Sequence, residues 1–182
     1  MTQASPKSGG AIAGLVLAGG ASSRMGSDKA QLKWRGVRLL DHAASLLKTA
    51  GAEAVFVLGR KDEPGGLADE APGAGPARAI SDAVRRLHKN GWERFLIAPV
   101  DMPLMTAEAL SVLTDAPDAC AYAGHPMPLY LAAGALNAKA SKARSVRALL
   151  QACGAESPPA PDETLFANIN TAEDYARLRR NA

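Results

Sequence analysis

Short apolar runs and helix-type apolar stripes alternate along the first half of the chain. Ile12–Ala18, Ala54–Leu58 and Phe95–Val100 are mostly apolar, a pattern typical of strands that are buried on both faces. Leu39–Ala50 and Ala77–Lys89 lie between them and read as helices. Strands that alternate with helices predict βαβ units with right-handed crossovers, and therefore a mostly parallel sheet in an α/β fold.

The middle of the chain follows a less regular pattern. Beyond Pro103 it predicts two helices, Thr106 to about Thr114 and Ser145–Cys153, and two apolar segments, Ala119–Tyr122 and Met127–Ala132. Earlier in the chain, Gly59–Gly75 is rich in Gly, Pro and acidic residues and has no periodicity. We expect it to be a long surface loop, which in many folds is functional.

The C-terminal part of the chain reads as a strand, Thr164–Ile169, followed by a helix, Thr171–Arg180. Thr171 is the expected N-cap, and Asp174 stands at the capping-box position. Alternation along the strand would place Asn168 and Asn170 on one face. An asparagine carbonyl can complete a Mg²⁺ shell, but the Asn170-Thr171 pair is equally consistent with helix capping alone.

Length and composition favour one domain over residues 11–182, preceded by a flexible tail over residues 1–10. The tail is polar and has no long apolar stretch behind it, so we expect a cytoplasmic protein without a membrane partner. The net charge is only +3 and the basic residues are scattered, which argues against nucleic acid as a partner. Cys120 and Cys153 have no CxxC spacing or nearby histidines, and we expect both to be buried apolar residues.

The first candidate site follows the first predicted strand, where Leu17 to Lys29 reads LAGGASSRMGSDK. Glycines let backbone N–H groups approach phosphate oxygens, and Arg24 and Lys29 supply positive charge against a transferring phosphoryl group. The spacing matches neither a Walker A loop nor the GxGxxG pattern. On glycine content alone, an ordinary strand-to-helix turn is an equally good reading.

The second candidate site is Asp101, which follows the apolar run Phe95–Val100 and precedes Met102-Pro103. The carboxyl ends of strands in an open α/β sheet face the ligand crevice, so Asp101 should meet the glycine loop there. A carboxylate oxygen in that place suits Mg²⁺. An aspartate before a proline can also be a plain turn residue, but two such strand ends together favour function.

Four segments together carry a family resemblance: LAGGASSRMGSDKAQL, APVDMPL, ARSVRALL and FANINTAEDYARL, in that order. They resemble the molybdenum cofactor guanylyltransferases, the MobA-type members of the nucleotidyltransferase superfamily. The resemblance runs from Leu15 to about Leu178. It implies a Rossmann-like, three-layer domain with a mostly parallel mixed sheet, the nucleotidyltransferase fold.

The resemblance also implies an activity and its substrates. GTP, with Mg²⁺, would donate GMP to the terminal phosphate of molybdenum-molybdopterin, which yields molybdopterin guanine dinucleotide and pyrophosphate. Transient contacts with proteins of cofactor biosynthesis or of delivery to molybdoenzymes would follow from that role. The family's residue roles transfer as follows: nucleotide binding by Leu17, Ala18, Gly19 and Gly20, phosphate binding by Lys29 and Arg24, Mg²⁺ binding by Asp101, and the acceptor side by Asn168 and Asn170.

The chain departs from the family pattern where the base should be recognised. Family members commonly have an asparagine after the second strand, but here Val57-Leu58-Gly59-Arg60 occupies that place. The usual Asp-x-x-Gly-Pro-Leu-Ala-Gly segment is replaced by Asp69–Ala79, in which Asp69 or Glu70 is the candidate acceptor for guanine N1 and N2. The resemblance also makes His125, in a His-Pro pair, a candidate pterin contact.

Three rival functions stay open at this point. A CTP-dependent molybdopterin cytidylyltransferase would share the loop and Asp101, although that branch usually has LAAG where Gly19 and Gly20 stand here. A nucleotidyltransferase for another small phosphorylated molecule fits the loop but fits the NINTAEDY ending less well. A non-catalytic homologue that only binds nucleotide or cofactor is disfavoured by the presence of Lys29 and Asp101.

Overall fold

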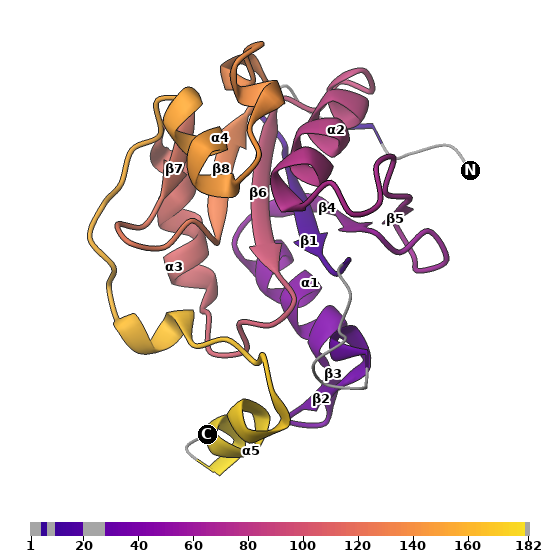
Figure 1. Cartoon of the computed structure of the whole chain (residues 1–182), viewed down its shortest axis with the longest axis vertical. Helices are drawn as coiled ribbons and strands as arrows, with labels where there is room; N and C mark the ends of the chain where they lie inside the picture. Colours follow the sequence, from indigo (N-terminus) through magenta and orange to yellow (C-terminus); the bar gives the residue numbers. More distant parts are fainter. Residues whose placement is uncertain (1–4, 7–9, 20–27, 181–182) are drawn as a thin grey trace.

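Helices cover both faces of a central sheet in this protein, and the C-terminal helix lies at one end of the molecule (Figure 1). The computed structural model describes residues 5–6, 10–19 and 28–180. Among these residues, no helix has both the length and the apolar character needed to cross a bilayer.

In the six-stranded main sheet, five strands run in one direction and one strand, β8 (Leu129–Ala132), runs in the opposite direction. Its strands are β1 (Ile12–Leu17), β4 (Ala52–Leu58), β5 (Gly66–Leu67), β6 (Arg94–Pro99), β7 (Ala119–Ala121) and β8 (Leu129–Ala132). Their order is β5-β4-β1-β6-β8-β7. β5, β4, β1 and β6 are parallel to one another, whereas β8 runs antiparallel to β6 and to β7. The predicted mostly parallel mixed sheet is thus confirmed.

The helices lie close to where the apolar spacing predicts them. They are α1 (Leu39–Thr49), α2 (Pro76–His88), α3 (Ala107–Val112), α4 (Val146–Ala152) and α5 (Ala172–Arg180). A 3₁₀ turn, Leu113–Asp115, continues α3 through the predicted end near Thr114. The hydroxyls of Thr106 and Ser145 accept hydrogen bonds from backbone N–H groups and cap α3 and α4.

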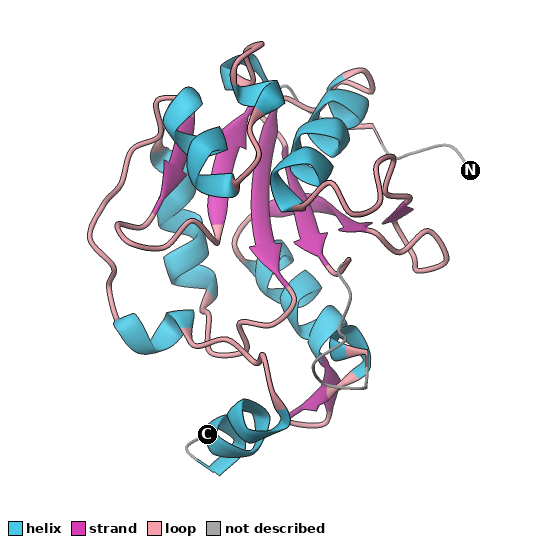
Figure 2. Cartoon of the chain, viewed as in Figure 1, coloured by secondary structure: helices cyan, strands magenta, loops and turns pink. Residues whose placement is uncertain are grey.

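The alternation of β1 side chains builds two apolar layers. Leu15 is buried among side chains of α2 and α4, whereas its neighbour Val16 is buried among side chains of α1 and α3. Figure 2 shows these helix pairs on opposite faces of the strands. Three layers, helix, sheet and helix, follow from this period of two, as expected for a strand that is buried on both faces.

The predicted strand Thr164–Ile169 is wrong. The segment begins with a 3₁₀ helix, Glu163–Phe166, whose first turn is capped by the Asp162 carboxylate, which accepts from the Thr164 N–H at 2.8 Å. The buried side chains are Phe166 and Ile169, which are three residues apart and not two. Phe166 ends the 3₁₀ helix and Ile169 follows it in irregular backbone, and both side chains pack into the same apolar layer.

Three short strands were not predicted. β2 (Lys33–Trp34) and β3 (Val37–Arg38) form a hairpin whose turn residues, Arg35 and Gly36, both have positive φ. This is the backbone that a two-residue hairpin turn requires. β5 lies inside the expected Gly59–Gly75 loop and adds a short parallel edge to β4.

The two cysteines are buried and free, as their spacing predicts. Cys120 is 3% exposed and Cys153 is 8% exposed, and each packs in one of the two apolar layers. Burial raises the pKa of both thiols, so both stay protonated near neutral pH. Neither residue is a candidate nucleophile.

The central strands end on a common line. Leu17 of β1 pairs with Leu58 of β4 on one side and with Pro99 of β6 on the other. Just beyond this line the backbones of Gly19 and Gly59 come very close, so that a Cβ on Gly59 would lie only 2.7 Å from the Gly19 Cα. Gly59 also has a φ of +80°. Both the contact and the dihedral require glycine at position 59.

We therefore predict that Gly59→Ala destabilises the protein more than the dihedral penalty alone. A Cβ at positive φ costs about 1–2 kcal/mol, and the contact with Gly19 adds to it. The matched control is Gly36→Ala, because Gly36 has a φ of +85° and open space around its Cβ position. Chemical denaturation measures both variants. Equal losses of unfolding free energy would show that the Gly19–Gly59 contact carries no weight.

Candidate active site

A lysine, an aspartate and an asparagine from distant parts of the chain meet beyond the carboxyl ends of the central strands. The Lys29 ammonium donates to Asp101 Oδ2 at 3.1 Å and to Asn170 Oδ1 at 3.0 Å. Lys29 and Asn170 are separated by 141 residues in sequence. The side chains of Lys29 and Asp101 are 19% and 20% exposed, so a ligand can still reach the pair. Asp101 thus contacts Lys29, the last residue of the predicted loop segment, whereas residues 20–27 of that segment lie outside the described part of the chain.

Local structure fixes two members of this cluster. Lys29 opens a 3₁₀ turn, Lys29–Gln31, whose N-cap is Asp28; the Asp28 carboxylate accepts from the Ala30 N–H at 3.1 Å. Asp101 stands two residues after β6, and its backbone carbonyl accepts from the Ile169 N–H at 2.9 Å. This last bond holds the C-terminal segment against the strand end.

The third member, Asn170, is held by the helix that follows it. The Thr171 hydroxyl accepts from the Asp174 N–H at 3.1 Å, and the Asp174 carboxylate accepts from the Thr171 N–H at 3.0 Å. This reciprocal pair is the capping box that the sequence predicts. Asp174 also accepts from the Asn170 N–H at 3.1 Å, and that bond is the main cause of the lowered pKa of its carboxyl. The start of α5 thus fixes the backbone of Asn170.

Asn168 has different contacts. Its side-chain amide donates to the Phe166 carbonyl at 3.0 Å and makes no hydrogen bond to Lys29 or Asp101. The expectation that Asn168 and Asn170 share a face rested on a strand that does not form. Of the two amides, only Asn170 touches the Lys29–Asp101 pair.

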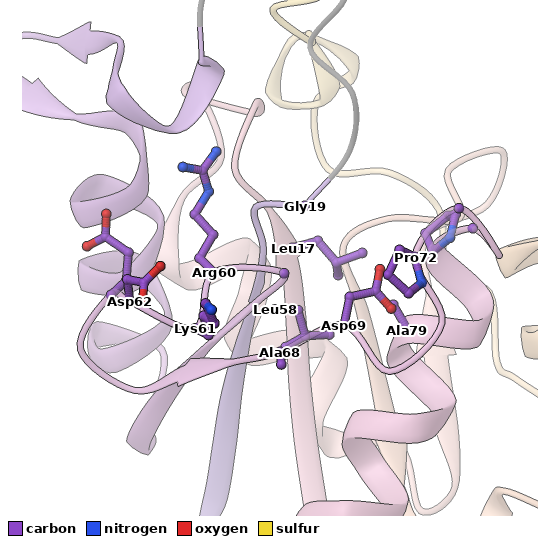
Figure 3. Close-up of a pocket in the computed structure, with 15 residues that line it drawn as sticks. Leu17, Gly19, Leu58, Arg60, Lys61, Asp62, Ala68, Asp69, Pro72 and Ala79 are labelled. Carbon is purple, nitrogen blue, oxygen red and sulfur yellow. The ribbon is translucent and has the colours of Figure 1, made fainter. Parts of the chain in front are cut away.

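A cavity of about 950 Å³ lies beside this cluster, at the ends of β1, β4 and β5 and the start of α2. Its lining includes the predicted nucleotide residues Leu17, Gly19 and Asp69, seen together in Figure 3. Ala18 is buried and takes part through its backbone carbonyl instead. A space of this size matches the clefts that hold small-molecule ligands.

Gly20 and Arg24, two of the predicted site residues, lie outside the described part of the chain, which stops at residue 19 and resumes at residue 28. Lys29 and Asp101 do not belong to the described cavity lining. The connection between the cavity and the cluster runs through Arg60, which lines the cavity and forms an ion pair with Asp28, the neighbour of Lys29.

Arg60 lines the cavity, although in the sequence it stands out only as a departure from the family pattern. Its guanidinium forms a two-pronged ion pair with the Asp28 carboxylate, and its Nε donates to the Ala18 carbonyl at 3.1 Å. The hydrogen bonds from Arg60 are the main reason that the pKa of Asp28 lies below its ordinary value. Its position directly after a predicted strand and a glycine was the available signal.

The close approach of Gly19 and Gly59 explains part of the departure around the base. Position 59 has no room for a side chain, so an asparagine cannot stand there without moving the end of β1. Asp69 lines the cavity and one of its oxygens accepts from the Ala71 N–H at 3.0 Å. Glu70 lines a much smaller recess beside α2, to which Asp69 also contributes, and is not part of the large cavity's lining.

The three histidines lie apart from the Lys29 cluster. His42 Nε2 is 3.0 Å from the Pro103 carbonyl, and His88 Nδ1 is 3.3 Å from the Trp92 carbonyl, so both serve local structure. His125 stacks on the Phe166 ring at 3.8 Å and pairs with Glu163 at 2.9 Å. It therefore lies against the segment that leads into Asn168 and Asn170.

The chain is similar to known proteins over most of its length. The chain matches the family described as MobA-like NTP transferase domain over residues 14–159. It is 37% identical to a molybdenum cofactor guanylyltransferase of Xanthomonas euvesicatoria pv. vesicatoria, over 91% of this chain and 93% of that one. A probable molybdenum cofactor guanylyltransferase of Mycobacterium avium is 33% identical, over 92% and 94% of the two chains.

Solved structures share the fold. A nucleotidyl transferase from Methanothermobacter thermautotrophicus superposes with a TM-score of 0.75 at 18% identity, over 94% of this chain and 97% of that one. Molybdopterin-guanine dinucleotide biosynthesis protein A from Archaeoglobus fulgidus gives a TM-score of 0.71 at 23% identity, over 93% and 97%. The predicted nucleotidyltransferase fold and the family resemblance are thus confirmed, and the chain belongs to the MobA-like NTP transferase family.

Proposed function

We propose that this protein is a molybdenum cofactor guanylyltransferase, which transfers GMP from GTP to the terminal phosphate of molybdenum-molybdopterin and releases pyrophosphate. The observation that carries the proposal is the meeting of Lys29, Asp101 and Asn170 at the mouth of the strand ends, beside a ligand-sized cavity. The relatives named for this activity match nearly the whole chain, which supports guanine as the base and molybdopterin as the acceptor.

The phosphates of GTP would lie beside Lys29. Its ammonium has two oxygen partners, Asp101 and Asn170, and both are side-chain oxygens that can exchange with phosphate oxygens. Charge-assisted bonds to phosphate are about twice as strong as neutral ones. Leu17, Ala18 and Gly19 would lie along the nucleotide, and we assign Gly20 and Arg24 to the same role from the sequence alone.

A divalent cation suits the oxygens at the strand ends. Asp101 and Asn170 already direct two oxygens at one cation, the Lys29 ammonium, and hard oxygen ligands are those that Mg²⁺ prefers. Among the described residues, no three His, Cys, Asp or Glu side chains could hold a metal ion by themselves. Asp101 would therefore hold Mg²⁺ together with phosphate oxygens and water, and the metal would supply charge neutralisation at the α-phosphate.

The reaction needs little acid–base help from the protein. The attacking oxygen belongs to a phosphate that is ionised at neutral pH, so positioning and charge neutralisation supply most of the rate enhancement. The absence of a histidine at the Lys29 cluster is consistent with this chemistry. Lys29 would neutralise negative charge on the phosphates, and Asn170 would hold the Lys29 ammonium and the metal in position.

The guanine ring would occupy the cavity near Asp69. A carboxylate accepts the two hydrogen bonds that guanine N1 and N2 donate, and the loss of such partners from a buried base is costly. Asp69 lines the cavity and Glu70 does not, which favours Asp69 as the selective residue. The acceptor would approach from the opposite side, past Asn168 and Asn170, where His125 lies against Phe166.

The remaining parts of the proposal follow from the activity itself. We place the reaction in the cytoplasm, with GTP and molybdopterin as the small-molecule substrates. The product is handed on through transient contacts with cofactor-biosynthesis or delivery proteins. Neither nucleic acid nor membrane takes part.

Nucleotide transfer from α-labelled GTP, CTP or ATP to molybdenum-loaded molybdopterin tests the proposal. We expect labelled dinucleotide and pyrophosphate from GTP in the presence of Mg²⁺, and none after chelation by EDTA. Transfer from CTP would move the protein to the cytidylyltransferase branch. Transfer only to other phosphorylated acceptors would overturn the molybdopterin assignment, and nucleotide binding without any transfer would indicate a binding protein.

We predict that Asp101→Ala lowers GMP transfer by at least about 10³-fold, because the metal loses its protein carboxylate, a change worth several kcal/mol. The thermal midpoint should stay near that of the wild type, since the Asp101 side chain is partly exposed and its backbone bond to Ile169 remains. Asp115→Ala, at an exposed position after α3, is the control and should keep full activity. An active Asp101→Ala protein would remove Asp101 from the site.

Lys29→Ala should act mainly on nucleotide binding. The loss of a charge-assisted bond to phosphate corresponds to about a 10–100-fold rise in KM for GTP. The exposed Lys48 of α1 offers the same substitution away from the site, and Lys48→Ala should leave KM unchanged. Steady-state kinetics with varied GTP distinguish the two. An unchanged KM for Lys29→Ala would contradict the phosphate assignment.

A further inference from the structure

Arg60 joins three segments that all lead into the proposed site. It follows β4 and Gly59, donates through Nε to the Ala18 carbonyl just after β1, and forms its two-pronged ion pair with Asp28 just before Lys29. Its side chain is 22% exposed and that of Asp28 is 37% exposed. The planar guanidinium fits two carboxylate oxygens and a carbonyl at once, which a lysine cannot do.

The backbone beneath Arg60 is tightly held. The Gly59 N–H donates to the Leu67 carbonyl at 2.9 Å, and the Glu63 N–H donates to the Arg60 carbonyl at 3.2 Å. A Cβ on Gly66 would lie 2.0 Å from the Arg60 carbonyl oxygen, so the turn closes tightly on itself at that point. The backbone that carries the Arg60 side chain is therefore well ordered by these contacts, two residues after the end of β4.

Asp28 connects Arg60 to the turn that begins at Lys29. The carboxylate that Arg60 binds also accepts from the Ala30 N–H and caps the 3₁₀ turn of which Lys29 is the first residue. The Gln31 N–H donates to the Asp28 carbonyl at 3.0 Å in the same turn. The position of Asp28 thus sets where the Lys29 side chain begins, and from there the ammonium reaches Asp101 and Asn170.

We propose that Arg60 is a positioning residue: it ties the end of β1 to the start of the Lys29 turn and so presets the Lys29 ammonium for the nucleotide phosphates. The inference rests on the proposed phosphate role of Lys29. Arg60 does not act as a base contact, because its Nε and both terminal nitrogens donate to protein oxygens. In Figure 3 its guanidinium points away from Asp69, on which the guanine proposal depends.

The first test does not use nucleotide. Residue-resolved amide hydrogen exchange is measured at Ala30, Gln31 and Leu32 in the wild type and in Arg60→Ala. We expect exchange to become at least tenfold faster in the variant, because the turn loses its tether. Arg85→Ala is the matched control: Arg85 pairs with Asp82 on α2 and has no contact with the site. Unchanged exchange in Arg60→Ala would overturn the tether.

The second test is a double-mutant cycle on kcat/KM for GTP. Asp28→Asn keeps an oxygen for the Ala30 cap but removes the charge that Arg60 binds. We expect Arg60→Ala and Asp28→Asn each to lower kcat/KM by about 10–100-fold, and the double variant to fall no more than about twofold further, as for two residues in one interaction. Arg60→Lys should recover only part of the loss, because an ammonium cannot keep all three contacts.

Two results would overturn the positioning role in this cycle. If the two losses multiply, Arg60 acts on something other than Asp28. If Arg60→Ala changes the ratio of GTP to ATP use, it contacts the base. A wild type that uses a different nucleotide would refute the proposed function, not the tether; the cycle then runs with that nucleotide, and the exchange experiment stands as it is.

Discussion

The register of the three central parallel strands is the constraint on which the site depends. Leu17 is in line with both Leu58 and Pro99, so β1, β4 and β6 all end at the same edge of the sheet. Whatever follows each strand then meets the others within a few ångströms. The glycines at 19 and 59 allow the first two chains to come close, and Asp101 arrives from the third. Larger residues at these glycines would move the strand ends apart.

Paired charges hold this edge together. Lys29 is matched by Asp101, and Arg60 by Asp28, so both of these cations have a carboxylate partner. Partly buried charges without partners would be costly, and paired ones keep their side chains in one conformation. Both pairs stay reachable from solvent, which is what a site for an anionic ligand requires. The same side chains would thus serve both stability and the proposed phosphate binding.

The secondary-structure elements that could be predicted are those that the local sequence pattern determines strongly. β1, β4, β6 and the five helices have long apolar runs or clear caps, and the structure forms them within a few residues of their predicted positions. Thr164–Ile169 is short, and its apolar residues fit a period of two as readily as a period of three. Here the Asp162 cap and the hydrogen bond from the Ile169 N–H to the Asp101 carbonyl stabilise a turn instead of a strand.

The sequence by itself determined the fold class, the family and the candidate residues Lys29, Asp101 and Asn170, because strand patterning and local motifs are written in contiguous residues. Only the tertiary structure decided which of these side chains touch, since contacts across 141 residues depend on strand register and on the packing of α5. It separated Asn170 from Asn168, brought Arg60 to Asp28, and closed position 59 to any side chain. Each of these outcomes depends on segments that follow different strands and meet at one edge of the sheet. No single segment of the sequence specifies such a contact.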